Sequence, residues 1–253
     1  MQDIEIGDYI AKGKYGRVYK AKNVRNETLA CKIMNKSKLI KDEINPTDEI
    51  EILKLINHPY IIRYINSFEY GEKGNERIYI LMEYITGGDL FAKILKGPIH
   101  ETTSLKYIQQ IAKGVSYLHE NGIMHCDIKS ENIMIDEENN VKIIDFGHAI
   151  KYQDGELFYR IVGTPLYLAP EIVSNKGYDY RIDIWMIGIL YFEMVTGNPP
   201  FDGESFIDIA RAIISGKYMF PDFLSYKTRF NISLILVTDP NYRAPLSTIL
   251  QMT

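Results

Sequence analysis

The 253-residue sequence predicts an α+β fold with two unequal parts, a small β-rich part followed by a larger, mostly helical part. Apolar runs typical of strands fill residues 4–83 together with one amphipathic helix, whereas helical periodicity dominates from Leu90 onward. Hydrophobic residues make up 46% of the chain, which is enough for a sizeable core. We therefore expect a single domain over residues 1–253, with a smaller β-rich part and a larger helical part.

Helices are predicted where apolar residues recur at helical spacing or fill a long run. The helix in the N-terminal part is expected to end before His58-Pro59. The run that begins at Asp183 is apolar almost all round, which predicts burial at the centre of the helical part, and it is too short to span a membrane. A short or incomplete last helix is expected after Arg243. The predicted segments are Asp48–Ile56, Thr103–Glu120, Asp183–Val195, Glu204–Ser215 and Arg229–Val237.

Composition and charge narrow the functional classes. The net charge of −4 does not indicate a basic surface that would bind nucleic acid or an acidic membrane. No signal peptide, transmembrane run or internal repeat stands out, and no feature indicates an oligomeric state. Two cysteines, Cys31 and Cys126, are expected to be unpaired thiols in a reducing compartment, which favours a cytoplasmic location.

The most informative residues lie between positions 125 and 147. Asp127 and Asn132 occupy one loop, and two short apolar runs at 133–135 and 141–144 follow, separated by a polar turn. If these runs form a hairpin, Asp145 returns to the loop that carries Asp127 and Asn132. The three side chains would then offer one carboxylate that can accept a proton, and a carboxylate and an amide oxygen that suit Mg²⁺. This arrangement predicts a phosphoryl-transfer site.

The stretch His125–Asn132, with sequence HCDIKSEN, and the triplet Asp145-Phe146-Gly147 resemble the catalytic loop and the metal-binding motif of the protein kinase family. One position differs. The family most often has arginine before the catalytic aspartate, and this chain has Cys126.

The resemblance implies a role for each polar residue of the site. Asp127 would orient the substrate hydroxyl and take its proton, and Lys129 would neutralise the transferring phosphoryl group. Asn132 and Asp145 would hold magnesium against the phosphate oxygens. The expected nucleotide and metal are therefore ATP and Mg²⁺.

The segment Ala11–Val18 resembles the glycine-rich loop of the same family, with Ala11 in place of the first glycine. Gly13 and Gly16 keep the open backbone that lets amide groups approach phosphate oxygens. The resemblance places Ala11, Gly13, Gly16 and Val18 beside ATP. Without the other motifs, this segment could be an ordinary turn between two strands.

Lys32 is the one charged residue in the apolar run Leu29–Met34. Such a lysine often only extends to solvent. Here it resembles the strand lysine that contacts the nucleotide phosphates in protein kinases, whose partner is a glutamate on the following helix. Counting back from Pro59 gives Glu49 as that partner, with Glu51 as the alternative.

The segment Glu83–Phe91 resembles the hinge, where backbone groups bind the adenine edge. The resemblance thus implies a bilobal domain, with lobes at about 1–82 and 87–253 joined by a hinge at 83–86. The resemblance implies that Met82 guards the pocket and that Asp89 contacts the ribose. Asp89 is equally suited to cap a helix that begins at Leu90, and the two roles are compatible. The nucleotide-binding residues expected from this part of the resemblance are Ala30, Met82, Glu83, Ile85, Asp89 and Met134.

Downstream, Gly163-Thr164-Pro165 and Ala169-Pro170-Glu171 resemble the substrate-docking loop and the end of the activation segment. Thr164 would help to fix Asp127 and Lys129. Glu171 would form a buried structural pair with Arg243. The motifs keep the family order from about residue 5 to 250, and they resemble the serine/threonine kinases of the calcium/calmodulin- and AMP-regulated group.

The resemblance also suggests substrate preference and regulation. Asp89, Glu131 and Glu193 match positions where kinases place acidic groups for basic residues upstream of the target hydroxyl; otherwise Glu193 only satisfies a helix and Glu131 faces solvent. Between His148 and Gly163 the chain has no serine or threonine, and its hydroxyl acceptors there are Tyr152 and Tyr159. Because Cys126 replaces the phosphate-binding arginine, we expect activity without phosphorylation of this loop.

Two other classes of function are weighed against a protein kinase. A pseudokinase scaffold that binds nucleotide without turnover is disfavoured, because the ionic residues of the motifs are all present. A small-molecule kinase on a related fold is disfavoured by the intact peptide-docking segment. A protein substrate is therefore the expected partner.

Overall fold

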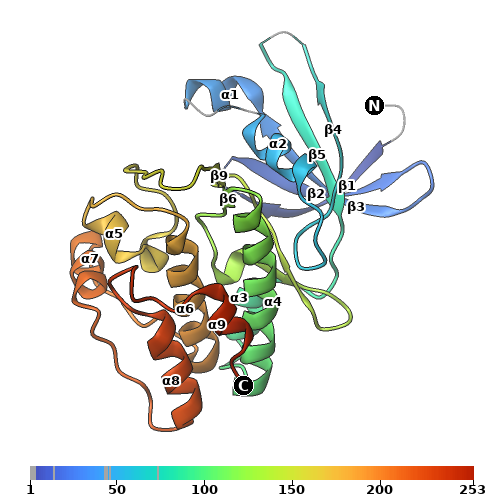
Figure 1. Cartoon of the computed structure of the whole chain (residues 1–253). Coiled ribbons are helices and arrows are strands. Elements are labelled where there is room, and N and C mark those ends of the chain that lie inside the picture. Colours follow the sequence, from blue (N-terminus) through green and yellow to red (C-terminus); the bar gives the residue numbers. More distant parts are fainter. Residues whose placement is uncertain (1–3, 14, 43–44, 46, 73) are drawn as a thin grey trace. The chain divides into compact units, whose positions relative to one another are not determined.

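The computed structural model describes the chain except residues 1–3, 14, 43–44, 46 and 73. It divides into two compact units, one that ends at Thr86 and one that begins at Gly87, and each unit is described by itself (Figure 1). Within the described residues, no helix is both long enough and apolar enough to cross a membrane.

The N-terminal unit contains an antiparallel five-stranded sheet with the strand order β1-β2-β3-β5-β4. The β2–β3 and β3–β5 pairs keep a continuous register. The β1–β2 and β4–β5 pairs contain register shifts. The strands are β1 (Ile4–Lys12), β2 (Gly16–Asn23), β3 (Thr28–Asn35), β4 (Tyr64–Tyr70) and β5 (Arg77–Glu83).

The sequence predicted one helix in this unit, and the residues that the structure describes there form two. Helix α2 (Asp48–Leu55) is the predicted one, with Ile52 and Leu53 buried. The additional helix α1 (Lys36–Lys41) is six residues long and buries only Leu39. Its sequence has too few apolar residues to show helical periodicity, and it begins because the Asn35 side chain accepts a hydrogen bond from the Lys38 amide.

The register divides the side chains of the sheet between two faces. Residues that lie directly opposite each other on neighbouring strands project to the same side. The pairs Ala11–Val18, Val18–Lys32 and Ala30–Met82 therefore share one face, which we call the lysine face. The opposite face carries a small core of Ala21, Leu29, Cys31, Tyr79 and Leu81, on which Phe68 packs with its ring stacked on Tyr79.

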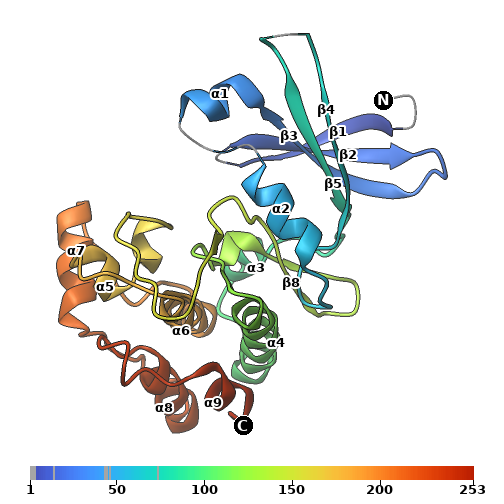
Figure 2. The same ribbon diagram turned by 45° about the horizontal axis from the view of Figure 1, so that its top comes forward.

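The C-terminal unit is built around helix α6 (Arg181–Thr196), which is buried along almost its whole length as the apolar run predicted. Helices α4 and α8 both pack against it, and Figure 2 shows α4 and α6 nearly end-on. The helices are α3 (Leu90–Ile94), α4 (Glu101–Glu120), α5 (Pro170–Val173), α6, α7 (Phe206–Ser215), α8 (Tyr226–Ile235) and α9 (Leu246–Leu250).

The predicted helix ends shift by two or three residues where a polar side chain caps the helix. Ser205 accepts a hydrogen bond from the Asp208 amide, so α7 begins after it and not at Glu204. Ser225 caps α8 in the same way and starts that helix earlier than predicted. The last helix, α9, is five residues long, as expected for a short final helix.

Short strands in the same unit flank the loops that carry the site residues. Strands β7 (Ile133–Ile135) and β8 (Val141–Ile143) form the predicted antiparallel hairpin. A second pair joins β6 (Ile123–Met124) to β9 (Ile150–Lys151). Two 3-10 turns, at Ser130–Asn132 and Pro165–Tyr167, complete the loops around them.

The predicted structural ion pair between Glu171 and Arg243 is present and buried. Two guanidinium nitrogens of Arg243 lie 2.9 and 3.1 Å from the two carboxylate oxygens of Glu171. Arg243 also donates to the carbonyl of Arg181 at 2.7 Å and stacks over the ring of Trp185. This pair fixes the loop after α8 to the start of α5.

Candidate active site

The loop before Asp127 is held by one buried carboxylate. Asp183, on the first turn of α6, accepts hydrogen bonds from the backbone amides of His125 at 2.9 Å and Cys126 at 2.8 Å. His119 lies 2.8 Å from the same carboxylate. Cys126 adopts a φ of +66°, a conformation that non-glycine residues rarely adopt. The two bonds to Asp183 hold this strained turn and thereby orient Asp127.

Asp127 is the centre of a polar network in the C-terminal unit. Its Oδ1 accepts a hydrogen bond from the hydroxyl of Thr164 at 2.8 Å. Its Oδ2 lies 2.9 Å from the amide nitrogen of Asn132 and 3.0 Å from Nζ of Lys129. Lys129 in turn donates to the Thr164 hydroxyl at 2.7 Å. The structure thus brings together the four residues that the sequence predicted to be catalytic.

The network keeps Asp127 ionised. Burial alone would raise the pKa of this carboxyl, but hydrogen bonds with His148, Lys129 and Thr164 and the charge of Lys129 hold the pKa well below its usual range. His148 contributes through Nδ1, which lies 3.5 Å from Oδ2 of Asp127. Asp127 is therefore an anion at neutral pH, and its carboxylate is held by four side chains, those of Thr164, Asn132, Lys129 and His148.

Asn132 and Asp145 have the chemistry that a magnesium site needs. The side-chain nitrogen of Asn132 donates both to the carbonyl and to the carboxylate of Asp127, at 2.8 and 2.9 Å. Its side-chain oxygen is therefore directed away from Asp127. The backbone of Ile144 pairs with Asn132 at 2.9 Å, so the hairpin returns Asp145 to this loop as predicted. One carboxylate and one amide oxygen fit a metal that takes few protein ligands and completes its shell with phosphate and water.

His125 links the catalytic loop to the segment that carries Asp145. Its ring accepts a hydrogen bond from the Asp127 amide at 3.3 Å, and its Nε2 lies 3.2 Å from the carbonyl of Ile144. Complete burial lowers the pKa of His125, which favours the neutral ring. Because Nδ1 accepts a hydrogen bond, the ring proton lies on Nε2, which donates it to the carbonyl of Ile144. The ring also packs against the edge of Phe146.

In the N-terminal unit, Lys32 and Glu49 form the predicted ion pair. The lysine nitrogen lies 2.7 and 2.8 Å from the two carboxylate oxygens, and both side chains are buried. A lysine that only extended to solvent would not be held in this way. Glu51, the alternative partner, is exposed.

Four other predicted nucleotide-binding residues share the lysine face of the sheet with Lys32, namely Ala11, Val18, Ala30 and Met82. The turn at the end of this face closes with a hydrogen bond from the Gly13 amide to the Gly16 carbonyl at 2.9 Å. A Cβ on Gly16 would lie 2.6 Å from the carbonyl oxygen of Ile33, so only glycine fits there. Pairing of β2 with β3 thus requires Gly16.

The predicted hinge residues fall on both sides of the division between the units. Glu83 ends β5, and its amide donates to the carbonyl of Arg63 at 3.0 Å, so this N–H is engaged within the unit. Asp89 caps α3 by accepting from the Ala92 amide at 2.7 Å, as its alternative role predicted. Asp89 also forms an isolated bridge with Met134, which brings these two predicted residues together.

Of the acidic residues proposed to contact a basic substrate, Glu193 is not available at the surface. It is buried in α6, and the hydroxyl of Tyr167 donates to its carboxylate. Burial raises the pKa of Glu193, and the bond from Tyr167 opposes that rise. Glu131, in contrast, is exposed. Glu193 therefore has a structural role in α6, which agrees with the alternative given above, and it also anchors the segment that contains Tyr167.

Two residues of the network were not assigned a role from sequence. Asp183 could have been recognised, because a carboxylate in an otherwise apolar, buried helix needs hydrogen-bond partners. His148 gave no such signal, since its contact with Asp127 depends on how the chain turns after Gly147.

Comparison with known proteins shows which family this chain resembles. The family model described as the protein kinase domain matches residues 4–253. CBL-interacting serine/threonine-protein kinase 20 of Arabidopsis thaliana is 33% identical over 261 residues, which cover 99% of this chain and 58% of that protein. The SNF1-related protein kinase catalytic subunit alpha KIN12 of the same plant is 36% identical, covering 99% and 51%. An Aurora kinase of Eremothecium gossypii is 35% identical, covering 98% and 68%.

The chain therefore belongs to the protein kinase family. It spans little more than half the length of the CBL-interacting relatives that it matches, between 51% and 58% of the first three.

Proposed function

We propose that this chain is a serine/threonine protein kinase that transfers the γ-phosphoryl group of ATP to serine and threonine hydroxyls of protein substrates. The observation that carries the proposal is the network in which Thr164 and Lys129 hold Asp127. A lysine two residues after the catalytic aspartate, joined to a threonine of the docking loop, is the arrangement that the resemblance associates with serine/threonine substrates. Relatives at 33% and 36% identity are named as serine/threonine or SNF1-related kinases, which supports the same class.

Catalysis of phosphoryl transfer consists mostly of positioning and charge stabilisation, and different residues of the chain have different roles in it. Lys32, fixed by Glu49, binds the α- and β-phosphates of ATP. Asp127 accepts the proton of the substrate hydroxyl, and Lys129 stabilises the negative charge on the transferring group. Asn132 and Asp145 would hold Mg²⁺, which supplies charge neutralisation at the phosphate oxygens when it is bound.

The test is transfer of labelled γ-phosphate from magnesium-ATP to a degenerate serine/threonine peptide library, with Asp127→Asn as the control. Transfer that the control lacks is expected, and the labelled peptides would report the preferred sequence. If neither protein transfers phosphate while both bind ATP, the chain is a pseudokinase scaffold. If a metabolite but no peptide is labelled, it is a small-molecule kinase.

The proposal includes a preference for basic residues upstream of the target hydroxyl. Because Glu193 is buried against Tyr167, the preference depends on Asp89, which is half-buried, and chiefly on Glu131, which is exposed within the catalytic loop. Glu131→Gln is expected to reduce the preference for an upstream arginine several-fold, with unchanged turnover of peptides that lack it. Kinetics on paired peptides with arginine or alanine would measure this. Equal use of both peptides by the unmodified chain would contradict the preference.

We also propose that activity does not require phosphorylation of the segment between His148 and Gly163. Backbone bonds already order this segment. Tyr152 donates to the carbonyl of Gly122 at 2.8 Å, and Phe158 and Tyr178 exchange two backbone bonds of 2.9 Å. Cys126, where kinases usually have a phosphate-binding arginine, is buried and can pair with no phosphate. Arg160 of the same segment supplies positive charge near Cys126 and Tyr178.

Phosphatase treatment is therefore expected to leave the rate of peptide phosphorylation within about twofold. Tyr159 is 62% exposed and is the accessible hydroxyl acceptor, whereas the Tyr152 hydroxyl donates to the His119 carbonyl at 3.2 Å. Tyr159→Phe should behave like the treated protein. Loss of activity on dephosphorylation, with recovery when phosphate returns to Tyr159, would overturn this proposal.

A further inference from the structure

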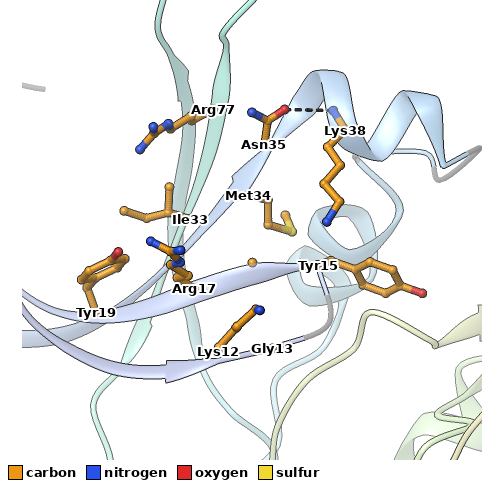
Figure 3. A pocket seen from close by; sticks show the side chains of 11 residues that line it. Lys12, Gly13, Tyr15, Arg17, Tyr19, Ile33, Met34, Asn35, Lys38 and Arg77 are labelled. Atoms are coloured by element: carbon orange, nitrogen blue, oxygen red, sulfur yellow. Dashed lines mark hydrogen bonds between the residues drawn. The ribbon is translucent and has the colours of Figure 1, made fainter.

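A cavity of about 430 Å³ lies in the N-terminal unit, and none of the residues assigned above to the Asp127 network lines it. Its size falls in the range of small-ligand sites, roughly 300–1,000 Å³. We call it the cationic cup. Its wall contains parts of β1, β2, β3, α1 and β5, and Figure 3 shows the side chains that surround it. The lining residues are Lys12, Gly13, Tyr15, Gly16, Arg17, Tyr19, Ile33, Met34, Asn35, Lys38 and Arg77.

The cup opens mainly on the face of the sheet opposite Lys32. Arg17 lies directly across from Ile33, and Arg77 lies across from Asn35. These positions alternate with those of the lysine face, so their side chains project to the other side. The cup is therefore distinct from the surface proposed to bind ATP, although Gly13 and Gly16 belong to the loop that borders both.

Charge is the most informative property of the cup. Four of its eleven lining residues are cationic (Lys12, Arg17, Lys38 and Arg77), and the lining contains no aspartate or glutamate. Within the described part of the chain, none of these four side chains takes part in an ion pair. All four are exposed, in a protein whose net charge is −4. Four like charges around one cavity repel each other, and an anion between them relieves that repulsion.

The chemistry of the wall favours a phosphomonoester over a carboxylate. Two of the four cations are arginines, whose planar guanidinium groups bind phosphate oxygens in pairs. Four cations also match a dianion better than a single negative charge. Beside them, Ile33 and the ring of Tyr19 provide an apolar wall on this face, and Met34 lines the cup from the side of the lysine face. The occupant should therefore join a phosphate to an apolar neighbour.

We propose that the cationic cup binds a phosphoserine or phosphothreonine residue of a polypeptide segment, with an adjacent apolar side chain on the Tyr19 and Ile33 side. Such a segment would connect the glycine-rich loop, through Arg17 and Lys12, with α1 and β5, through Lys38 and Arg77. The proposal does not rest on the proposed catalytic function, because binding at the cup needs neither ATP nor turnover.

The test is binding of a fluorescent peptide that contains one phosphoserine next to leucine and no other charge, measured by anisotropy without nucleotide. The unphosphorylated peptide, free O-phosphoserine and inorganic phosphate serve as comparison ligands. We expect the phosphopeptide to bind most tightly, the free phosphate compounds to compete weakly, and the unphosphorylated peptide not to bind. Binding should weaken with added salt.

Variants locate the site. Arg17→Gln and Arg77→Gln are each expected to weaken phosphopeptide binding by roughly tenfold or more, because each removes a charged hydrogen-bond donor. Arg17→Lys should lose part of the affinity, since it keeps the charge but not the paired donors. Lys54→Gln removes an exposed cation of α2 outside the cup and should have no effect. All these side chains are exposed, so the variants should fold, which a thermal melt would verify.

Three outcomes would overturn the proposal. Equal binding of the phosphorylated and unphosphorylated peptides would show that phosphate is not recognised. Equal loss in Lys54→Gln and Arg17→Gln would indicate diffuse charge attraction. Unchanged binding in both arginine variants would place the phosphate elsewhere.

Discussion

Replacing Asp127 with asparagine is expected to lower the rate of phosphoryl transfer by roughly 10²–10⁴, the range that a positioned proton acceptor contributes. Asparagine fills the same volume but cannot accept a proton, and its amide nitrogen would face the donors of Lys129 and Thr164. ATP binding should persist, because Lys32 and Glu49 form their pair within the other unit. Turnover and ATP affinity, measured on the same preparation, separate these two effects.

The matched control is Asp222→Asn, which makes the same chemical change at an exposed position. It should leave turnover unchanged. If Asp127→Asn retained more than about a tenth of the activity, the acceptor role of Asp127 would be wrong. If it lost ATP binding as well, the effect would be on structure and not on chemistry.

The pH dependence of turnover gives an independent check on the Asp127 network. Because the pKa of Asp127 is held well below its usual range, protonation of this carboxyl should not limit activity at mildly acid pH. Thr164→Val removes one of the hydrogen bonds that lower this pKa, so the Asp127 carboxyl itself should titrate at a higher pH than in the unmodified chain, which an NMR titration of its carboxyl carbon would measure. An unchanged titration would mean that Thr164 has no influence on the ionisation of Asp127.

The parts of this site that could be predicted from sequence are those that local pattern determines. The hairpin of β7 and β8 follows from two apolar runs and a polar turn, and it suffices to return Asp145 to the loop of Asp127. The pairing of Lys32 with Glu49 followed from the family resemblance. In contrast, helix α1 was missed because its formation depends on a cap at Asn35 and on burial of one leucine, which give no periodic signal.

The remaining errors and omissions concern contacts that only the tertiary structure creates. The resemblance matches Glu193 to a position where kinases place acidic groups for basic substrate residues, but α6 buries this side chain against Tyr167. The contact of His148 with Asp127 and the grouping of Arg17 with Arg77 each join residues that are distant in sequence. The cationic cup in particular depends on sheet register, because a shift of one residue in β3 would turn Ile33 and Asn35 to the lysine face.

The largest expected effect on stability comes from the ion pair between Arg243 and Glu171. Arg243→Ala should lower the free energy of unfolding by about 3–5 kcal/mol, because it leaves the buried carboxylate without its partner. It also removes the donor to the Arg181 carbonyl and the cation over the Trp185 ring. For a domain of this size such a loss lowers the melting temperature by roughly 10 °C.

Two further variants distinguish a buried pair from the loss of an arginine in general. Arg211→Ala breaks a contact of 3.6 Å with Asp208 on α7, in which the arginine is 77% exposed, and should change the melting temperature little. Combining Glu171→Gln with Arg243→Met removes both charges, so the double variant should be more stable than Arg243→Ala alone. If instead the double variant were the less stable of the two, the cost would lie in the lost bonds of Arg243 to backbone carbonyls, and the unpaired carboxylate would not be the main source of instability.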